Sequence, residues 1–158
     1  MVKYVKGNLL DSDCDYICHQ VNCQGVMGSG IAKQIRERWS EVYDDYRSFC
    51  EGFEWPDYIL GHVCLSPIEN STQQVANMFS QEKFGYDGHR YTSYDAFDEC
   101  LRRLASYAEP GNKIGFPKNI GCGLGGGNWN VISALIEEIM GKDYEVYIYE
   151  YDEKIREN

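Results

Sequence analysis

The stretch GVMGSGIAKQIRERW (residues 25–39) carries glycines at positions 25, 28 and 30 and then changes to a helical pattern. Ile31, Ile35 and Trp39 recur at every fourth position, which is typical of the apolar face of a helix. A glycine loop directly before a helix has two explanations. Either the N–H groups at the helix start bind an anion, or the glycines make a tight turn that has no ligand.

A length of 158 residues predicts a single domain over residues 1–158. The hydrophobic content of 43% suffices for a packed core. The opening MVKYVKGNLL (1–10) alternates polar and apolar residues without the apolar centre of a signal peptide. The seven cysteines are odd in number and form neither a CxxC motif nor a cluster with histidine. We therefore expect a cytoplasmic protein with reduced thiols and with no metal or other cofactor.

The formal charge of −10 argues against nucleic acid as a general partner and against anionic membranes. Both of these partners are bound largely through Lys and Arg. A small polyanion remains compatible with this charge, because backbone N–H groups attract phosphate locally even on an acidic protein.

Segments with strand and helix patterns alternate along the chain, which predicts an α/β sandwich around a central sheet. Thr92 and Asp95 have the spacing of a capping box, and Asn128 stands where it can cap the last helix. The expected strands are residues 3–9, 16–21, 58–68, 73–79, 113–117 and 144–150, and the expected helices begin near residues 29, 40, 92 and 128.

A second glycine segment, KNIGCGLGGGNW (118–129), also lies between an expected strand and an expected helix. Neither segment has the GxGxxG or GK[ST] spacing of the common nucleotide-binding motifs. Ligands of open α/β sheets bind at the carboxyl ends of strands, where both segments are expected. Two such loops favour a ligand over two unrelated turns, and together they can hold a diphosphate from two sides.

The stretches HQVNCQGVMGSGIA (19–32) and FPKNIGCGLGGGNW (116–129) together resemble the macrodomain family, whose members bind ADP-ribose. They are most similar to the branch of ADP-ribose 1''-phosphate phosphatases and terminal ADP-ribose glycohydrolases. YVKGNLL (4–10) and NMFSQEKFG (77–85) match the same branch. This resemblance runs from about residue 4 to residue 149. It implies a three-layer α/β/α fold with a mixed sheet of about six strands.

The resemblance also implies ligand contacts. Asn8 would bond the adenine amino group, Leu9 would line the adenine slot, and Asn22 would bond the distal ribose. Candidates to stack on adenine are Phe84, Tyr86 and Tyr149. The expected ligand-binding loop residues are Gly25, Val26, Met27, Gly28, Ser29, Gly30, Ile31, Gln81, Ile120, Gly121, Cys122, Gly123, Leu124, Gly125 and Gly126.

His19 and Asn22 are the predicted catalytic residues, with His19 as the acid or base because imidazole titrates near neutral pH. The alternative for His19 is a core histidine that bonds a backbone carbonyl. The glycohydrolase branch resembles an enzyme with a lysine nucleophile and an aspartate base. The matching positions here are Gln81 and Gly125, which cannot perform those roles.

The sequence thus predicts a metal-independent hydrolase that converts ADP-ribose 1''-phosphate to ADP-ribose and phosphate. One alternative is a reader that binds ADP-ribose without turnover. The other is a hydrolase that removes ADP-ribose from modified protein or nucleic acid.

Overall fold

The structure is a computed structural model that describes residues 1–85 and 87–151. One six-stranded sheet has the order β1-β6-β5-β2-β4-β3. Only the β3–β4 pair is antiparallel among the pairings of these strands. The strands are β1 (Val2–Lys6), β2 (Tyr16–Asn22), β3 (Val63–Pro67), β4 (Gln74–Gln81), β5 (Lys113–Pro117) and β6 (Glu145–Glu150). The predicted mixed sheet is therefore confirmed.

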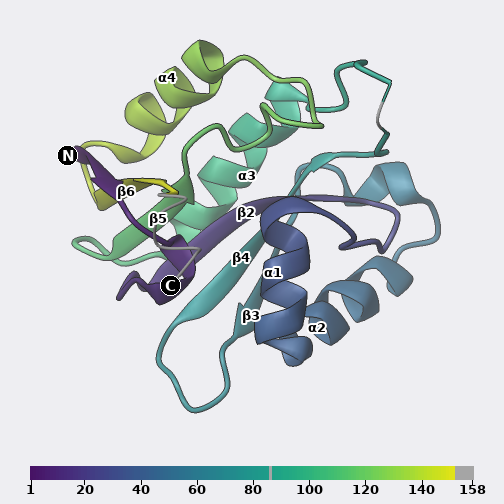
Figure 1. Ribbon diagram of the computed structural model, residues 1–158, viewed down its shortest axis with the longest axis horizontal. Helices are drawn as coiled ribbons and strands as arrows, with labels where there is room; N and C mark the ends of the chain where they lie inside the picture. Colours follow the sequence, from purple (N-terminus) through teal and green to yellow (C-terminus); the bar gives the residue numbers. More distant parts are fainter. Residues whose placement is uncertain (86, 152–158) are drawn as a thin grey trace.

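Helices cover both faces of the sheet (Figure 1). One face packs on α3 and α4 through the largest apolar cluster, and the opposite face packs on α1 and α2 through two smaller clusters. The helices are α1 (Gly30–Arg38), α2 (Ser40–Glu51), α3 (Tyr94–Tyr107) and α4 (Trp129–Met140). This arrangement confirms the three-layer α/β/α sandwich. No helix in the described ranges is both long and apolar enough to cross a membrane.

The middle strands position the loops that matter for function. Strand β2 lies between β5 and β4 and runs parallel to both. Parallel strands bring their carboxyl ends to one edge of a sheet. The segments that follow β2, β4 and β5 therefore start side by side, and the two glycine segments are the ones after β2 and β5.

The first strand is shorter than predicted. Strand β1 ends at Lys6, and the Asn8 side chain then accepts a hydrogen bond from the Leu10 N–H and caps a 3-10 turn over Leu9–Asp11. The expected strand at residues 58–68 begins only at Val63, because residues 56–59 form a second 3-10 turn that starts at a proline.

The caps of the last two long helices differ in how well they were predicted. Asn128 caps α4 as expected, since its side chain accepts from the Asn130 N–H. Thr92 does not cap α3. Ser93 takes that position and accepts from the Ala96 N–H, whereas the Thr92 hydroxyl bonds elsewhere.

His19 lies in the interior of the sandwich and is completely buried. Its Nε2 is 2.6 Å from Oδ1 of Asn77 on the neighbouring strand β4. The Asn77 Nδ2 donates to the Cys64 carbonyl, which makes Oδ1 the acceptor and His19 Nε2 the donor. Burial lowers the pKa of His19 to about 4. The core therefore holds a neutral imidazole.

We predict that Gly115→Ala destabilises the protein by roughly 1–3 kcal/mol, the usual cost of overpacking. A Cβ on Gly115 would lie 2.5 Å from Leu9 Cδ1 and 2.8 Å from Cys14 Sγ. Urea denaturation gives the free energy of unfolding. Gly123→Ala is the control, since a Cβ there meets nothing within 4 Å. Equal stability of the two variants would contradict the packing of Leu9 on β5.

We also predict that His19 makes the fold sensitive to acid. The unfolded chain takes up a proton near pH 6.5 and the folded chain only near pH 4, so stability falls as the pH drops through this window. The slope from one proton is at most about 1.4 kcal/mol per pH unit. His19→Gln, which keeps a donor toward Asn77, should lose less stability than wild type between pH 7 and 5 in denaturant titrations. Parallel curves for the two proteins would refute this.

Candidate ADP-ribose site

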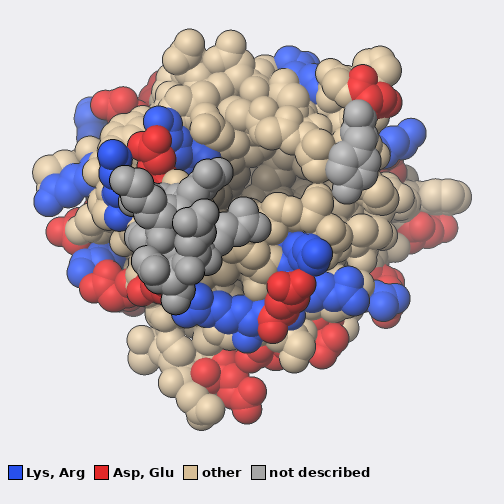
Figure 2. All heavy atoms as spheres, viewed as in Figure 1, with Lys and Arg blue, Asp and Glu red and all other residues tan. Residues whose placement is uncertain are grey.

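A cavity of about 360 Å³ opens at the carboxyl ends of the middle strands. Figure 2 shows the hollow, and most of the side chains around its opening are uncharged. Both glycine loops line it, as predicted. The predicted residues on its wall are Asn22, Val26, Gly28, Ser29, Gly30, Ile31, Gln81, Ile120, Gly121, Gly123, Leu124 and Gly125.

The first loop is held by Asn22 at the end of β2. The Asn22 Nδ2 donates to the Val26 carbonyl at 2.8 Å, and its Oδ1 accepts from the Gln24 N–H at 2.9 Å. The Tyr46 hydroxyl lies 2.7 Å from the Asn22 backbone oxygen and supports the same turn from α2. The N–H groups of residues 28–30 donate to no described residue. They stand at the start of α1, where a helix attracts anions.

The second loop folds back on itself, which pairs some of its N–H groups and leaves others without an acceptor. The N–H of Gly126 donates to the Gly123 carbonyl and that of Gly127 to the Gly121 carbonyl. Gly121 has a φ of +73°, a conformation that favours glycine. Within the described ranges, no acceptor is bonded to the N–H groups of residues 121 and 123–125. Both loops that line the cavity thus contain N–H groups without an acceptor in the described part of the chain.

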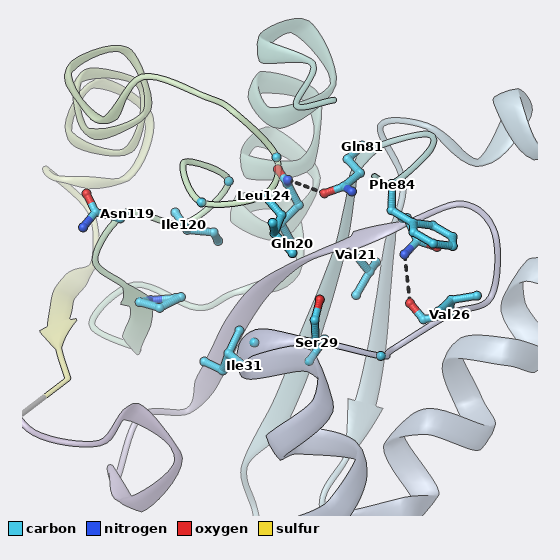
Figure 3. Close-up of a pocket in the computed structure, with 18 of the residues that line it drawn as sticks. Gln20, Val21, Val26, Ser29, Ile31, Gln81, Phe84, Asn119, Ile120 and Leu124 are labelled. Atoms are coloured by element: carbon cyan, nitrogen blue, oxygen red, sulfur yellow. Dashed lines mark hydrogen bonds between the residues drawn. The ribbon is translucent and has the colours of Figure 1, made fainter. Parts of the chain in front are cut away.

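A chain of side-chain hydrogen bonds joins the second loop to β4. Figure 3 draws the bond of this chain between Gln20 and Gln81. Thr92 Oγ1 donates to the Gly121 carbonyl at 2.7 Å. Gln20 Nε2 donates to Thr92 Oγ1 at 2.9 Å and to Gln81 Oε1 at 2.7 Å. The chain ends where Gln81 Nε2 donates to the Lys83 carbonyl at 2.7 Å. We call these four contacts the amide relay.

The amide relay fills the space in which a base at position 125 would stand. A Cβ on Gly125 would lie 2.5 Å from Thr92 Oγ1 and 2.8 Å from Gln20 Nε2. The Gly125 carbonyl also accepts from the N–H groups of Tyr91 and Thr92. The loop is therefore fixed too close to Thr92 for an aspartate side chain at position 125. This agrees with the expectation that Gln81 and Gly125 do not support a lysine–aspartate mechanism.

The structure corrects the expected position of His19. Its imidazole is fully buried against Asn77 and is not part of the cavity wall, so it cannot reach a ligand there. The structure is closer to the alternative of a core histidine, although His19 bonds the Asn77 side chain and not a backbone carbonyl. The lowered pKa of His19 also disfavours the charged form that a general acid needs.

Six other expected contacts also lie off the cavity wall. The Asn8 oxygen is occupied by the Leu10 N–H, and Leu9 is buried against β5. Met27 is buried in the cluster under α2. The others are Gly25, Cys122 and Gly126. Of the candidates for adenine stacking, Phe84 lines the cavity and Tyr149 does not, while Tyr86 lies outside the described residues.

Seven residues of the wall were missed: Gln20, Val21, Ala32, Gly85, Pro117, Lys118 and Asn119. Pro117 ends β5 and Lys118 and Asn119 follow it directly, so the rule that ligands bind at carboxyl strand ends points to them. Gln20 had no such signal, because its partner Thr92 is 72 positions away. Lys118 is the only ionisable group on the described wall, and its Nζ lies 3.7 Å from a Glu150 carboxylate oxygen.

The described residues contain no group of three or more His, Cys, Asp or Glu side chains placed to hold a metal ion. The polar groups of the cavity wall are instead amides, a serine hydroxyl, one lysine and backbone donors, and they stand beside apolar side chains such as Val26, Phe84 and Leu124. Such a wall matches a ligand that is rich in acceptor oxygens.

No family model matches the chain. It is 27% identical to an ADP-ribose 1''-phosphate phosphatase of Saccharomyces cerevisiae, with 94% of this chain and 98% of that protein aligned. It is 37% identical to a DNA ADP-ribosyl glycohydrolase of Thermus aquaticus over 95% of this chain. That alignment covers 41% of the Thermus protein, so the chain spans less than half of its length.

Solved structures of macrodomain proteins have the same fold as this chain. A macrodomain protein of Streptomyces coelicolor superposes with a TM-score of 0.74 at 25% identity, covering 96% of this chain and 99% of that one. A Thermosipho africanus DarTG in complex with ADP-ribose has the same fold, with a TM-score of 0.77 at 21% identity over 94% of this chain and 41% of that one. With its mixed sheet, its two glycine loops and these likenesses, the chain belongs to the macrodomain family.

Proposed function

We propose that this chain binds ADP-ribose in the cavity and hydrolyses ADP-ribose 1''-phosphate to ADP-ribose and phosphate. The observation that carries the proposal is that two loops line one cavity and that each contains N–H groups without an acceptor among the described residues. A diphosphate offers acceptor oxygens on both of its sides, and backbone donors at a helix start favour such an anion. The local donors would thereby overcome the net charge of −10.

The yeast relative supports the choice of substrate. It is aligned over nearly its whole length and is named as an ADP-ribose 1''-phosphate phosphatase. The ligand of the Thermosipho structure supports the choice of ADP-ribose. We further propose a cytoplasmic location, because all seven cysteines are free thiols.

The sheet order suggests the direction of the ligand. Lys118 and Asn119 follow β5, on the side of β6 and β1, and Asn8 follows β1. Gln81 and Asn22 end β4 and β2 on the other side. In Figure 3, Asn119 lies across the cavity from Phe84 and Val26. The resemblance puts adenine near Asn8 and the distal ribose near Asn22. We therefore propose adenosine toward Asn119 and the distal ribose, with its 1''-phosphate, toward Asn22 and Gln81, which leaves Phe84 at the ribose end and not at adenine.

In the proposed reaction a water molecule attacks the phosphorus, and the bond from phosphorus to the 1'' oxygen breaks. One proton of the water passes by way of a phosphate oxygen to the 1'' oxygen, which becomes the hydroxyl of ADP-ribose, and the other stays on the released phosphate. The free donors around the site would stabilise the negative charge of the transition state. No proton transfer by His19 is required, and the phosphate oxygens themselves can accept the proton of the attacking water.

A reader that binds without turnover is the second candidate. It is favoured by the cavity wall, in which Lys118 is the only ionisable group among the described residues. The described wall offers amide and backbone donors to an anion but no carboxylate or imidazole for acid–base catalysis.

Phosphate release from ADP-ribose 1''-phosphate tests the proposed activity. We expect release above the buffer rate by wild type and by His19→Gln at pH 7, because His19 does not reach the cavity. Calorimetry with ADP-ribose, AMP and NAD runs in parallel. ADP-ribose binding without phosphate release would leave the reader. Release of ADP-ribose from a modified protein or nucleic acid, but not from the phosphate ester, would leave the third hypothesis.

Gly28→Val tests the first loop. A valine side chain at this point of the wall should obstruct the approach of the diphosphate and weaken ADP-ribose binding at least tenfold, about 1.4 kcal/mol. Gly28 lacks the left-handed φ of Gly25 and Gly30, so the substitution should leave the fold intact. Calorimetry gives the affinity and thermal unfolding checks the fold. Unchanged affinity in a folded variant would remove this loop from the site.

A further inference from the structure

The amide relay has a direction, because both of its ends are backbone carbonyls that only accept. The Gly121 carbonyl requires Thr92 to donate, which makes the Thr92 oxygen an acceptor for Gln20. Gln20 therefore presents Nε2 to both Thr92 and Gln81. The Ser80 hydroxyl donates to Gln20 Oε1 at 2.6 Å, which is compatible with this orientation.

The direction passes on to Gln81. Its Oε1 accepts from Gln20, and one of its two N–H groups donates to the Lys83 carbonyl. The remaining N–H has no acceptor among the described residues, and Gln81 lines the cavity. A flip of the Gln81 amide would break both of these bonds, so the spare group on this wall residue is a donor.

Asn22 repeats the pattern on the adjacent strand. Asn22 and Gln81 are register partners at the ends of β2 and β4. The Asn22 Oδ1 accepts from the Gln24 N–H and its Nδ2 donates to the Val26 carbonyl, which again leaves one N–H over. Two amides whose acceptor oxygens are already bonded thus stand side by side at one end of the cavity.

We propose that Gln81 is a specificity-determining residue that binds a phosphate at the 1'' end of the ligand through its spare N–H, with Gln20 and Thr92 as positioning residues. This inference rests on the proposed binding of ADP-ribose. Each of the two amides keeps a spare N–H, while its oxygen already accepts at least one hydrogen bond. Spare donors of this kind suit a phosphate dianion, whose oxygens only accept. An unmodified 1'' hydroxyl needs an acceptor for its proton and gains less from this wall.

Gln81→Glu is the first test, because it replaces the donor by a charged acceptor of nearly the same shape. Calorimetry measures the affinity for ADP-ribose. Stopped-flow competition against a fluorescent ADP-ribose analogue, read before turnover, measures the affinity for ADP-ribose 1''-phosphate. We expect the ratio of the two affinities to shift at least tenfold against the phosphate ester, and ADP-ribose binding to change less than threefold. Gln24→Glu is the matched control, since it adds the same charge on an exposed side chain off the cavity wall.

Thr92 tests the positioning role without touching Gln81. Thr92→Val removes the hydroxyl that orients Gln20 and should reduce the preference for the phosphate ester, whereas Thr92→Ser keeps the hydroxyl and should restore it. An unchanged affinity ratio in Gln81→Glu, or equal ratios in the Thr92 pair, would overturn the inference even when ADP-ribose binds normally. A wild-type chain that binds no ADP-ribose would instead remove the proposed function, and this inference with it.

Discussion

The amide relay from the Gly121 carbonyl to the Lys83 carbonyl determines the shape and the polarity of the site. It ties the second glycine loop to β4 through Thr92, Gln20 and Gln81. Buried or half-buried amides must be bonded at both ends, since an unpaired polar group costs about 1–3 kcal/mol. The relay meets this requirement with backbone carbonyls at its two ends, so its direction is a consequence of bonding and not of side-chain preference.

An acidic protein can hold a polyanion because attraction over a few ångströms outweighs the screened field of distant surface charge. Among the described residues the cavity wall has one charged side chain, Lys118, and its other polar groups are amides, a serine hydroxyl and backbone donors. Their geometry selects a ligand that fits, whereas a basic patch would accept many anions.

Much of the fold could be predicted because its signals are local. Glycine spacing, helix periodicity and the Asn128 cap each depend on neighbouring residues, and the structure agrees with them. The signals that failed depend on contacts distant in sequence. Thr92 looks like a cap until its hydroxyl meets Gly121, which comes from a loop 29 positions later.

His19 shows a second limit. Strand alternation places it on the same face as Val21, which does line the cavity. Period alone does not say where along the strand the core ends and the cavity begins, and that boundary falls between these two residues. The wall residues just after β5 could have been identified from the strand-end rule, whereas the role of Gln20 requires the three-dimensional pairing.

The missing Cβ at Gly125 has an evolutionary consequence. A mutation to aspartate at this position alone would collide with Thr92 and Gln20, and loss of either partner alone would leave unbonded amides. Conversion of this site to one with a carboxylate base therefore needs several substitutions that are favourable only together. Such epistasis would separate lineages whose site has a carboxylate base from lineages whose site has the amide relay.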